Sequence, residues 1–299
     1  MEDLESHKIR LAVFDWLQQV AEAKQHVLDW NELTKGFAFQ GQVIPLIGAK
    51  GIWKPKAINR FPISIVSVEK SSYSDEFINN DTLYYSYRGD NPMHPDNVGL
   101  REAMKEKIPI VYFHQAVKGK YVVAWPVFII SDEPDKLRFT VSVESGEVLQ
   151  NENIFSEPNA EYRRKYQTRE VLVRLHQKSF REKVLLAYKD HCAVCNLKHR
   201  SLLDAAHIIP DSEGGRPEVP NGLSLCKIHH AAYDQHIIGI TPDYLIEVRE
   251  DILHEVDGPM LKHGIQANNN QKLILPRSMA LKPNKDWLDE RYQLFKKYA

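Results

Sequence analysis

Residues 191–240 have the sequence HCAVCNLKHRSLLDAAHIIPDSEGGRPEVPNGLSLCKIHHAAYDQHIIGI, and this stretch determines how the rest of the chain is interpreted. It contains a Cys-x-x-Cys pair, Cys192 and Cys195, and a later Cys-x-x-His pair, Cys226 and His229. Tetrahedral zinc sites are typically built in this way, because each short pair supplies two ligands from one tight turn. We therefore expect these four residues to hold a structural Zn²⁺ ion.

The cysteine count supports a metal-binding protein, whereas the net charge by itself does not indicate a nucleic-acid partner. All three cysteines of the 299-residue chain lie in this stretch, and an odd number in this pattern suits a metal better than disulfides. The net charge of −1 gives no overall basic field. Lysine and arginine are nevertheless concentrated in residues 161–200, where they could contact phosphates, although a solvated helix face would have the same composition.

A second pattern, His207, Asn221 and His230, is interleaved with the zinc ligands. The local sequence around it predicts a strand, a Gly- and Pro-rich loop, a returning strand and a helix. The three residues in this order resemble the HNH (ββα-metal) endonuclease family. The resemblance implies a fold that brings His207 and His230 together around one divalent ion, Mg²⁺ or Mn²⁺.

The resemblance also implies roles for the three residues. His207 suits the general base, because an imidazole with a pKa of about 6.5 can take a proton from water near neutral pH. His230 suits the divalent ion through a neutral ring nitrogen. Asn221 either orients His207 through the loop backbone or helps to hold the ion.

One position departs from the family pattern. Many HNH proteins carry an acidic residue or a second histidine immediately before the base, but this chain has Ala206 there. Asp234 could replace that ligand, because it follows His230 by four residues on the same helix face. Asp204 is the second candidate, since it shares the strand parity of Ala206. Alternatively, either aspartate makes a structural hydrogen bond to a histidine ring.

The N-terminal part of the chain has a different texture. Apolar residues at helical spacing predict one or two helices within residues 8–34, and a further helix is expected over residues 98–107. Short β-rich runs separated by turn residues predict a strongly curved sheet or partial barrel. These runs are residues 37–48, 62–69, 82–89, 108–115, 120–130 and 137–144.

Within this part, the segments YYSYRGD, DNVGLREAM, IPIVYFHQ and GKYVVAWPVFII resemble the SRA domains, which belong to the PUA-like barrels. SRA domains read modified cytosine by base flipping. The resemblance implies aromatic side chains that stack on a base and polar side chains that bind its edge, although strand aromatics are more often core residues. The candidate DNA-binding residues are Trp53, Tyr73, Asp75, Tyr87, Asp96 and Asn97, and Tyr85 and Trp125 could also stack.

The expected organisation is an α+β protein with two domains. Residues 1–150 form the recognition domain, residues 151–170 the linker, and residues 171–299 the zinc-stapled nuclease domain. In the latter we expect a helix after residue 171 that buries Phe180, Val184, Leu185 and Tyr188, a strand pair over residues 243–261, and a last helix over 285–298. No apolar run is long enough for a membrane span, and we expect a cytoplasmic protein.

These features predict a DNA endonuclease that resembles modification-dependent HNH restriction enzymes and acts on double-stranded DNA carrying methyl- or hydroxymethyl-cytosine. One HNH site makes one cut, so a homodimer on DNA is expected. Two alternatives are open. The enzyme could nick DNA or follow unmodified sequence, or the chain could be a non-catalytic zinc-dependent DNA-binding module.

Overall fold

The computed structural model describes residues 2–24, 26–68, 82–142 and 171–298. The chain divides into two compact units, Met1–Ser179 and Phe180–Ala299. The expected linker at residues 151–170 lies outside the described residues. Two of the DNA-binding candidates, Tyr73 and Asp75, also lie outside them, in the separate range 69–81. The domain boundaries at 150 and 171 therefore stay predictions.

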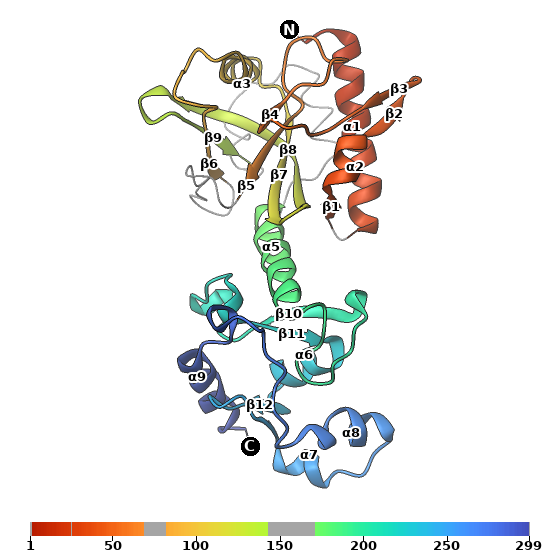
Figure 1. Cartoon of the computed structure of the whole chain (residues 1–299), viewed down its shortest axis with the longest axis vertical. Coiled ribbons are helices and arrows are strands. Elements are labelled where there is room, and N and C mark those ends of the chain that lie inside the picture. Colours follow the sequence, from red (N-terminus) through yellow and green to blue (C-terminus); the bar gives the residue numbers. More distant parts are fainter. Residues whose placement is uncertain (1, 25, 69–81, 143–170, 299) are drawn as a thin grey trace, which may run out of the picture. The chain divides into compact units, whose positions relative to one another are not determined.

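A seven-stranded sheet forms the centre of the N-terminal unit (Figure 1). Its strands follow the order β4-β5-β7-β8-β9-β6, and β1 also pairs with β8. The β5–β7 pair is parallel and the other pairs are antiparallel. The strands are β1 (Val27–Asp29), β4 (Ile52–Trp53), β5 (Ser64–Val68), β6 (Thr82–Ser86), β7 (Ile110–Val117), β8 (Lys120–Glu133) and β9 (Arg138–Ser142).

The long strand β8 makes the sheet curl. Its first part pairs with β7, its last part pairs with β9, and the register shifts between Ile129 and Ser131. Such a shift bends a strand and increases its twist, so one strand can serve two differently oriented halves of a sheet. The expected curved sheet is confirmed, as is the α+β class.

Successive side chains of the central strands point to opposite faces of the sheet, so that each face has its own hydrophobic core. On β7, Phe113 packs against helices α1 (Leu4–Ala23) and α2 (Trp30–Lys35), which lie along one side in Figure 1. The adjacent Tyr112 belongs to the core on the other face, together with Phe139 of β9. One or two helices were expected over residues 8–34, and the structure has two, whose apolar side chains explain why they cover this face.

Helix α3 (Pro95–Lys105) connects β6 to β7, close to the predicted residues 98–107. Pro95 occupies its first turn, where a missing N–H costs nothing. The run 37–48 forms a small separate hairpin, β2 (Phe37–Phe39) with β3 (Gln42–Ile44), and does not join the main sheet.

The C-terminal unit contains an antiparallel strand pair followed by a helix. Strands β10 (Leu203–His207) and β11 (Gly222–Cys226) pair, and α6 (Lys227–Asp234) follows directly. Helix α5 (Val171–Ala187) buries the expected Phe180, Val184 and Leu185 in the same core, with Tyr188 just beyond its end. The last helix, α9 (Lys285–Phe295), is also where the sequence predicted it.

The predicted strand pair over residues 243–261 is wrong. Only β13 (Ile246–Val248) lies there, and its partner is the earlier strand β12 (Ile238–Ile240). The rest of the segment forms helices α7 (Glu250–His254) and α8 (Pro259–Gly264). Two acidic residues in the first turn of α7 and Pro259 at the start of α8 favour helix beginnings, and these signals outweigh the β-branched residues nearby.

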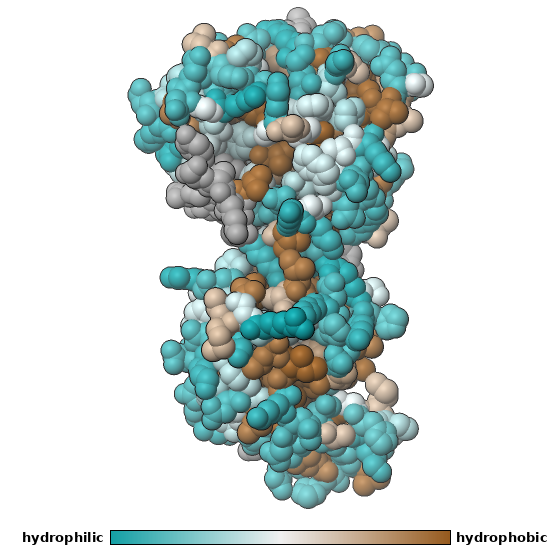
Figure 2. Space-filling model, viewed as in Figure 1, coloured by the Kyte–Doolittle hydropathy of each residue, from teal (hydrophilic) through white to brown (hydrophobic). Residues whose placement is uncertain are grey.

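Hydrophilic side chains cover most of the face shown in Figure 2, with apolar side chains in smaller patches. Within the described ranges, the structure has no helix with the length and apolar character needed to cross a membrane.

Arg10 ties α1 to the sheet from a fully buried position. Its guanidinium donates to the carbonyl oxygens of Pro62 at 3.0 Å and Pro109 at 2.9 Å, and it pairs with the Glu2 carboxylate at 2.8 Å. Without the arginine, the two carbonyl oxygens would lose this buried donor, and the Glu2 carboxylate would lose its guanidinium partner and keep the His7 ring, 3.6 Å away, as a neighbour.

We predict that Arg10→Met lowers the free energy of unfolding of the N-terminal unit by about 3–5 kcal/mol. Denaturant unfolding followed by tryptophan fluorescence measures this change. Because part of the cost comes from a carboxylate that has lost its guanidinium partner, the double variant Arg10→Met/Glu2→Gln should regain some of the loss. Equal stability of Arg10→Met and the unsubstituted protein would contradict the assigned role.

Candidate functional site

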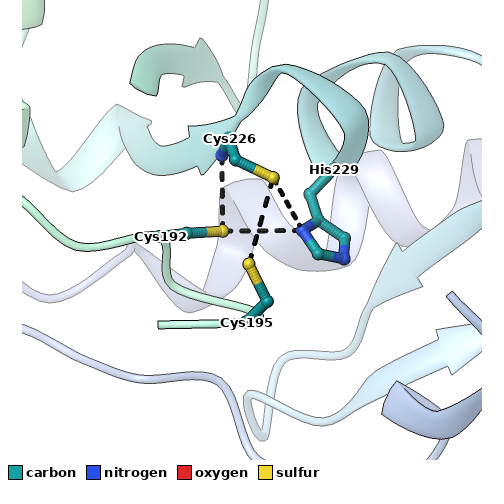
Figure 3. Close-up of side chains that lie close together, drawn as sticks. All are labelled: Cys192, Cys195, Cys226 and His229. Atoms are coloured by element: carbon teal, nitrogen blue, oxygen red, sulfur yellow. Dashed lines mark hydrogen bonds between the residues drawn. The ribbon is translucent and has the colours of Figure 1, made fainter. Parts of the chain in front are cut away.

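The four predicted zinc ligands meet at one point in the C-terminal unit (Figure 3). The ligand atoms of Cys192, Cys195, Cys226 and His229 all lie within 4.8 Å of one another. The Cys195 and Cys226 sulfurs are 4.0 Å apart, and His229 Nδ1 lies 3.6 Å from Cys192 Sγ and 3.1 Å from Cys226 Sγ. In a tetrahedral site with Zn–S bonds of about 2.3 Å, sulfurs lie about 3.8 Å apart. The donor set and its spacing therefore suit a zinc ion.

The surrounding backbone explains why the ligands converge. Strand pairing places Leu203 opposite Cys226, and α6 begins at the next residue, so His229 falls in its first turn. On the other side, Cys192 accepts a hydrogen bond from the Cys226 backbone N–H at 3.3 Å. The second ring nitrogen of His229 lies 2.6 Å from the Gly264 carbonyl oxygen, a contact that would orient the ring and leave Nδ1 for a metal.

His207 lies at the end of β10, where its ring stacks on Phe180 of α5. The ring centroids are 4.1 Å apart and the rings are inclined by 16°. Nε2 of His207 is buried and has no hydrogen-bond partner among the described residues; Asp211 Oδ1 lies 3.8 Å away. Burial lowers the pKa of His207, against the opposing effect of Asp211, so its neutral form is favoured.

Asn221 is fully buried and binds the backbone that follows His207. Its side-chain oxygen accepts from the Ile209 N–H at 2.9 Å, and its amide nitrogen donates to the carbonyl oxygens of Ile209 at 2.9 Å and Arg216 at 3.0 Å. Its own carbonyl oxygen accepts from the Ile208 N–H at 2.9 Å. The amide is thus used to close the loop between the two strands.

His230 follows His229 but faces a different environment, because successive helical residues are about 100° apart. Its Nδ1 lies 3.7 Å from an Asp204 oxygen and its Nε2 lies 3.3 Å from an Asp234 oxygen. Both acidic residues considered from the sequence are therefore beside this ring, one at each nitrogen.

Asp204 also has partners that the sequence did not reveal. Lys227 donates a hydrogen bond to it, and Arg181 Nε lies 3.6 Å from its second oxygen. The contact with His230 and the hydrogen bond and charge of Lys227 hold the pKa of the Asp204 carboxyl well below its usual value. No local sequence signal predicts such contacts, because Arg181 comes from α5 and approaches only when the unit folds.

Among the described residues, only the three cysteines and His229 form a group of three or more candidate ligands within 4.8 Å of one another. His230, Asp204 and Asp234 do not form such a group. The binding of a second ion at these residues therefore stays a prediction.

The described DNA-binding candidates of the N-terminal unit have structural contacts. Trp53 Nε1 donates to the Pro45 carbonyl oxygen at 2.9 Å, and Tyr87 is buried against Phe139 with ring centroids 4.6 Å apart. Tyr85 and Trp125 are also buried.

Asn97 and Asp96, at the start of α3, contact the preceding loop. The fully buried Asn97 accepts from the Arg88 N–H at 2.8 Å and donates to the Arg88 and Asn91 carbonyl oxygens, while Asp96 forms an ion pair with Arg88. Base contact by any of these residues stays a prediction.

We predict that the purified protein contains about one zinc ion per chain. Cys195→Ser should lose this ion and lower the unfolding free energy of the C-terminal unit by more than about 3 kcal/mol, because metal binding contributes to folding. Elemental analysis and thermal unfolding measure the two effects. His263→Ala, which changes an exposed histidine on α8, should keep both zinc and stability. Retention of full zinc by Cys195→Ser would contradict the assigned ligand set.

Comparison with known proteins adds a family match. Residues 192–241 match the model of a family described as HNH endonuclease. No curated protein matches the chain.

Solved structures give distant similarities. A modification-dependent TagI restriction endonuclease has 16% identity and a TM-score of 0.29, covering 78% of this chain and 81% of its own. The SUVH5 SRA domain in complex with methylated CHH DNA has 20% identity and a TM-score of 0.26, covering 38% and 90%. The phosphorothioation-dependent type IV restriction endonuclease ScoMcrA has 16% identity and a TM-score of 0.22, covering 70% and 56%.

At these scores the three structures assign no function, whereas the family match coincides with the segment that carries both ligand pairs and the strand–strand–helix unit. The C-terminal unit therefore contains an HNH domain over residues 192–241.

Proposed function

We propose that this protein is a metal-dependent DNA endonuclease in which His207 is the general base. The observation that carries the proposal is the HNH family match over residues 192–241. In the same unit, β10, β11 and α6 bring His230 close enough to His207 to act on it electrostatically. Hydrolysis of a phosphodiester needs a nucleophile, a base that generates it and positive charge on the scissile phosphate.

His207 is suited to take the proton of the attacking water. Its lowered pKa keeps the ring neutral, which is the form that a base requires. Its buried Nε2 is without a hydrogen-bond partner among the residues that the structure describes, and an unsatisfied buried nitrogen in a native protein suggests a functional reason. Asn221 supports this role by accepting hydrogen bonds from the backbone of Ile208 and Ile209, which directly follow His207. These contacts favour an orienting role for Asn221 over ion binding.

His230 and Asp234 would hold the divalent ion, Mg²⁺ or Mn²⁺. A neutral imidazole nitrogen and a carboxylate oxygen are suitable ligands, and the His230 Nε2 and Asp234 lie 3.3 Å apart. When bound, the ion would stabilise negative charge on the phosphate and on the leaving oxygen. Asp204, whose oxygen lies 3.7 Å from Nδ1 of the same ring, would then help to orient it, as carboxylates commonly do for metal-bound histidines.

The N-terminal unit would direct this activity to modified DNA. Support comes from the SRA-like segments of the sequence and from the curled sheet in which they lie. A nuclease domain with little sequence preference needs such a reader, and methyl- or hydroxymethyl-cytosine is the substrate class that the resemblance implies. Because a double-strand break needs two cuts, we further propose that two copies act together on DNA.

We predict that the protein with Mg²⁺ or Mn²⁺ cleaves plasmids carrying methyl- or hydroxymethyl-cytosine and leaves matched unmodified plasmids intact. His207→Ala should reduce the cleavage rate by at least about 100-fold at unchanged zinc content, since it removes the base. Gel analysis of supercoiled, nicked and linear DNA measures both effects.

Each other outcome of this assay is informative. Equal cleavage of both plasmids would contradict recognition of modified bases and support the nuclease activity. Accumulation of nicked DNA would indicate a nicking enzyme. Full activity of His207→Ala would overturn the assigned base. DNA binding without cleavage would favour the zinc-dependent binding module.

We also predict different effects for the two aspartates. Asp234→Asn should raise the concentration of Mg²⁺ needed for half-maximal cleavage by more than about 100-fold, because it removes a ligand, whereas Asp204→Asn should raise it by about tenfold. Metal titrations of the cleavage rate test this order. The reverse order would make Asp204 the ligand and Asp234 the orienting carboxylate.

A further inference from the structure

The wall of the candidate site contains a contact that the chemistry described above does not use. Phe180 is 2% exposed and its ring lies against the ring of His207 at 4.1 Å between centroids, inclined by only 16°. Most apolar side chains in a core contact several neighbours and are not stacked on one particular ring. Here a core residue covers one face of the proposed base.

The opposite strand is adapted to this contact. Gly222 is the residue that pairs with His207 across β10 and β11. A Cβ atom at Gly222 would lie 2.8 Å from Cζ of Phe180 and 2.4 Å from Cγ2 of Val184. The Gly222 backbone is extended, with φ −130° and ψ 142°, so it is crowding by α5 and not backbone conformation that excludes a side chain. The space opposite His207 is thus occupied by Phe180.

Such a stack restricts the imidazole in a way that its own torsions do not. The torsion that rotates a histidine ring about its Cβ–Cγ bond has broad minima, so the direction of the ring nitrogens is poorly fixed by rotamer preference alone. Asp211, at 3.8 Å, is too far from Nε2 for a hydrogen bond that would fix it. A nearly parallel aromatic face opposes tilting of the imidazole toward that face and still allows movement within the plane of the ring.

We propose that Phe180 is a positioning residue that sets the plane of the His207 imidazole for proton transfer. The inference rests on the proposed function, in which His207 is the base. Misplacement of a reacting group by about 1 Å can reduce a rate about 100-fold, so a fixed ring plane has a measurable effect. Phe180 acts through His207 and touches no reacting atom.

The first test is spectroscopic and does not depend on activity. With ring-labelled histidine, the Cε1–H proton of His207 should resonate upfield of those of most of the 13 histidines, because it lies over an aromatic ring. His207→Gln assigns the signal by its disappearance. Phe180→Leu should move the signal downfield, toward the position of an unstacked histidine. A His207 signal at the usual position in the unsubstituted protein would overturn the proposal.

The second test separates positioning from packing. Phe180→Leu should reduce kcat about tenfold to 100-fold with KM for DNA changed less than about twofold, since it alters the base and not DNA binding. Phe180→Tyr, which keeps the aromatic face, should restore most of kcat. Leu185→Ala removes another fully buried side chain from α5 and should lower thermal stability while leaving kcat unchanged.

Three results would overturn the positioning role: full kcat in Phe180→Leu, no recovery in Phe180→Tyr when its zinc content and near-ultraviolet circular dichroism are normal, or an equal loss of kcat in Leu185→Ala. Failure of the proposed function has a different signature. In that case the unsubstituted protein cleaves no DNA, or His207→Ala cleaves normally, while the upfield His207 signal is still present.

Discussion

Two short ligand pairs that lie far apart in the sequence must meet at one point, and this requirement organises the C-terminal unit. The strand register that sets Leu203 opposite Cys226 also sets His207 opposite Gly222. The start of α6 directly after Cys226 places His229 beside the sulfurs and turns His230 away from them. The proposed catalytic groups therefore take their positions from the same backbone that gathers the predicted zinc ligands, and the Gly264 contact extends this arrangement to α8.

The two histidines at the start of α6 illustrate how neighbouring residues acquire different chemistry. His229 is 2% exposed and faces thiols, whereas His230 is partly exposed and faces carboxylates at both ring nitrogens. Arg181 also lies beside Asp204, and His230 and Lys227 lower the pKa of this carboxyl, which favours its ionised form. Helix α5 thus contributes both a charge, through Arg181, and an aromatic face, through Phe180.

In the N-terminal unit, the equivalent constraint is the length of β8. A strand that pairs with β7 at one end and β9 at the other forces the sheet to curl, and the alternation of its side chains requires a core on each face. The aromatic residues considered for base stacking fill these cores where the structure describes them. A reader function would therefore depend on surface elements as much as on those aromatics.

The sequence by itself predicted which four side chains form the candidate zinc site, because the short-range spacing of cysteine and histidine within a turn is a local property. It also predicted the strand–loop–strand–helix order, the buried face of α5 and the curved N-terminal sheet, since hydrophobic periodicity reflects local geometry. It failed over residues 243–261, where helix-start signals outweighed β propensity. Only the tertiary structure decided that Phe180 covers His207, that Asn221 closes the loop and that Arg181 and Lys227 surround Asp204. These contacts join different helices and strands. The residue periodicity within one segment does not predict which side chains of another segment will contact it.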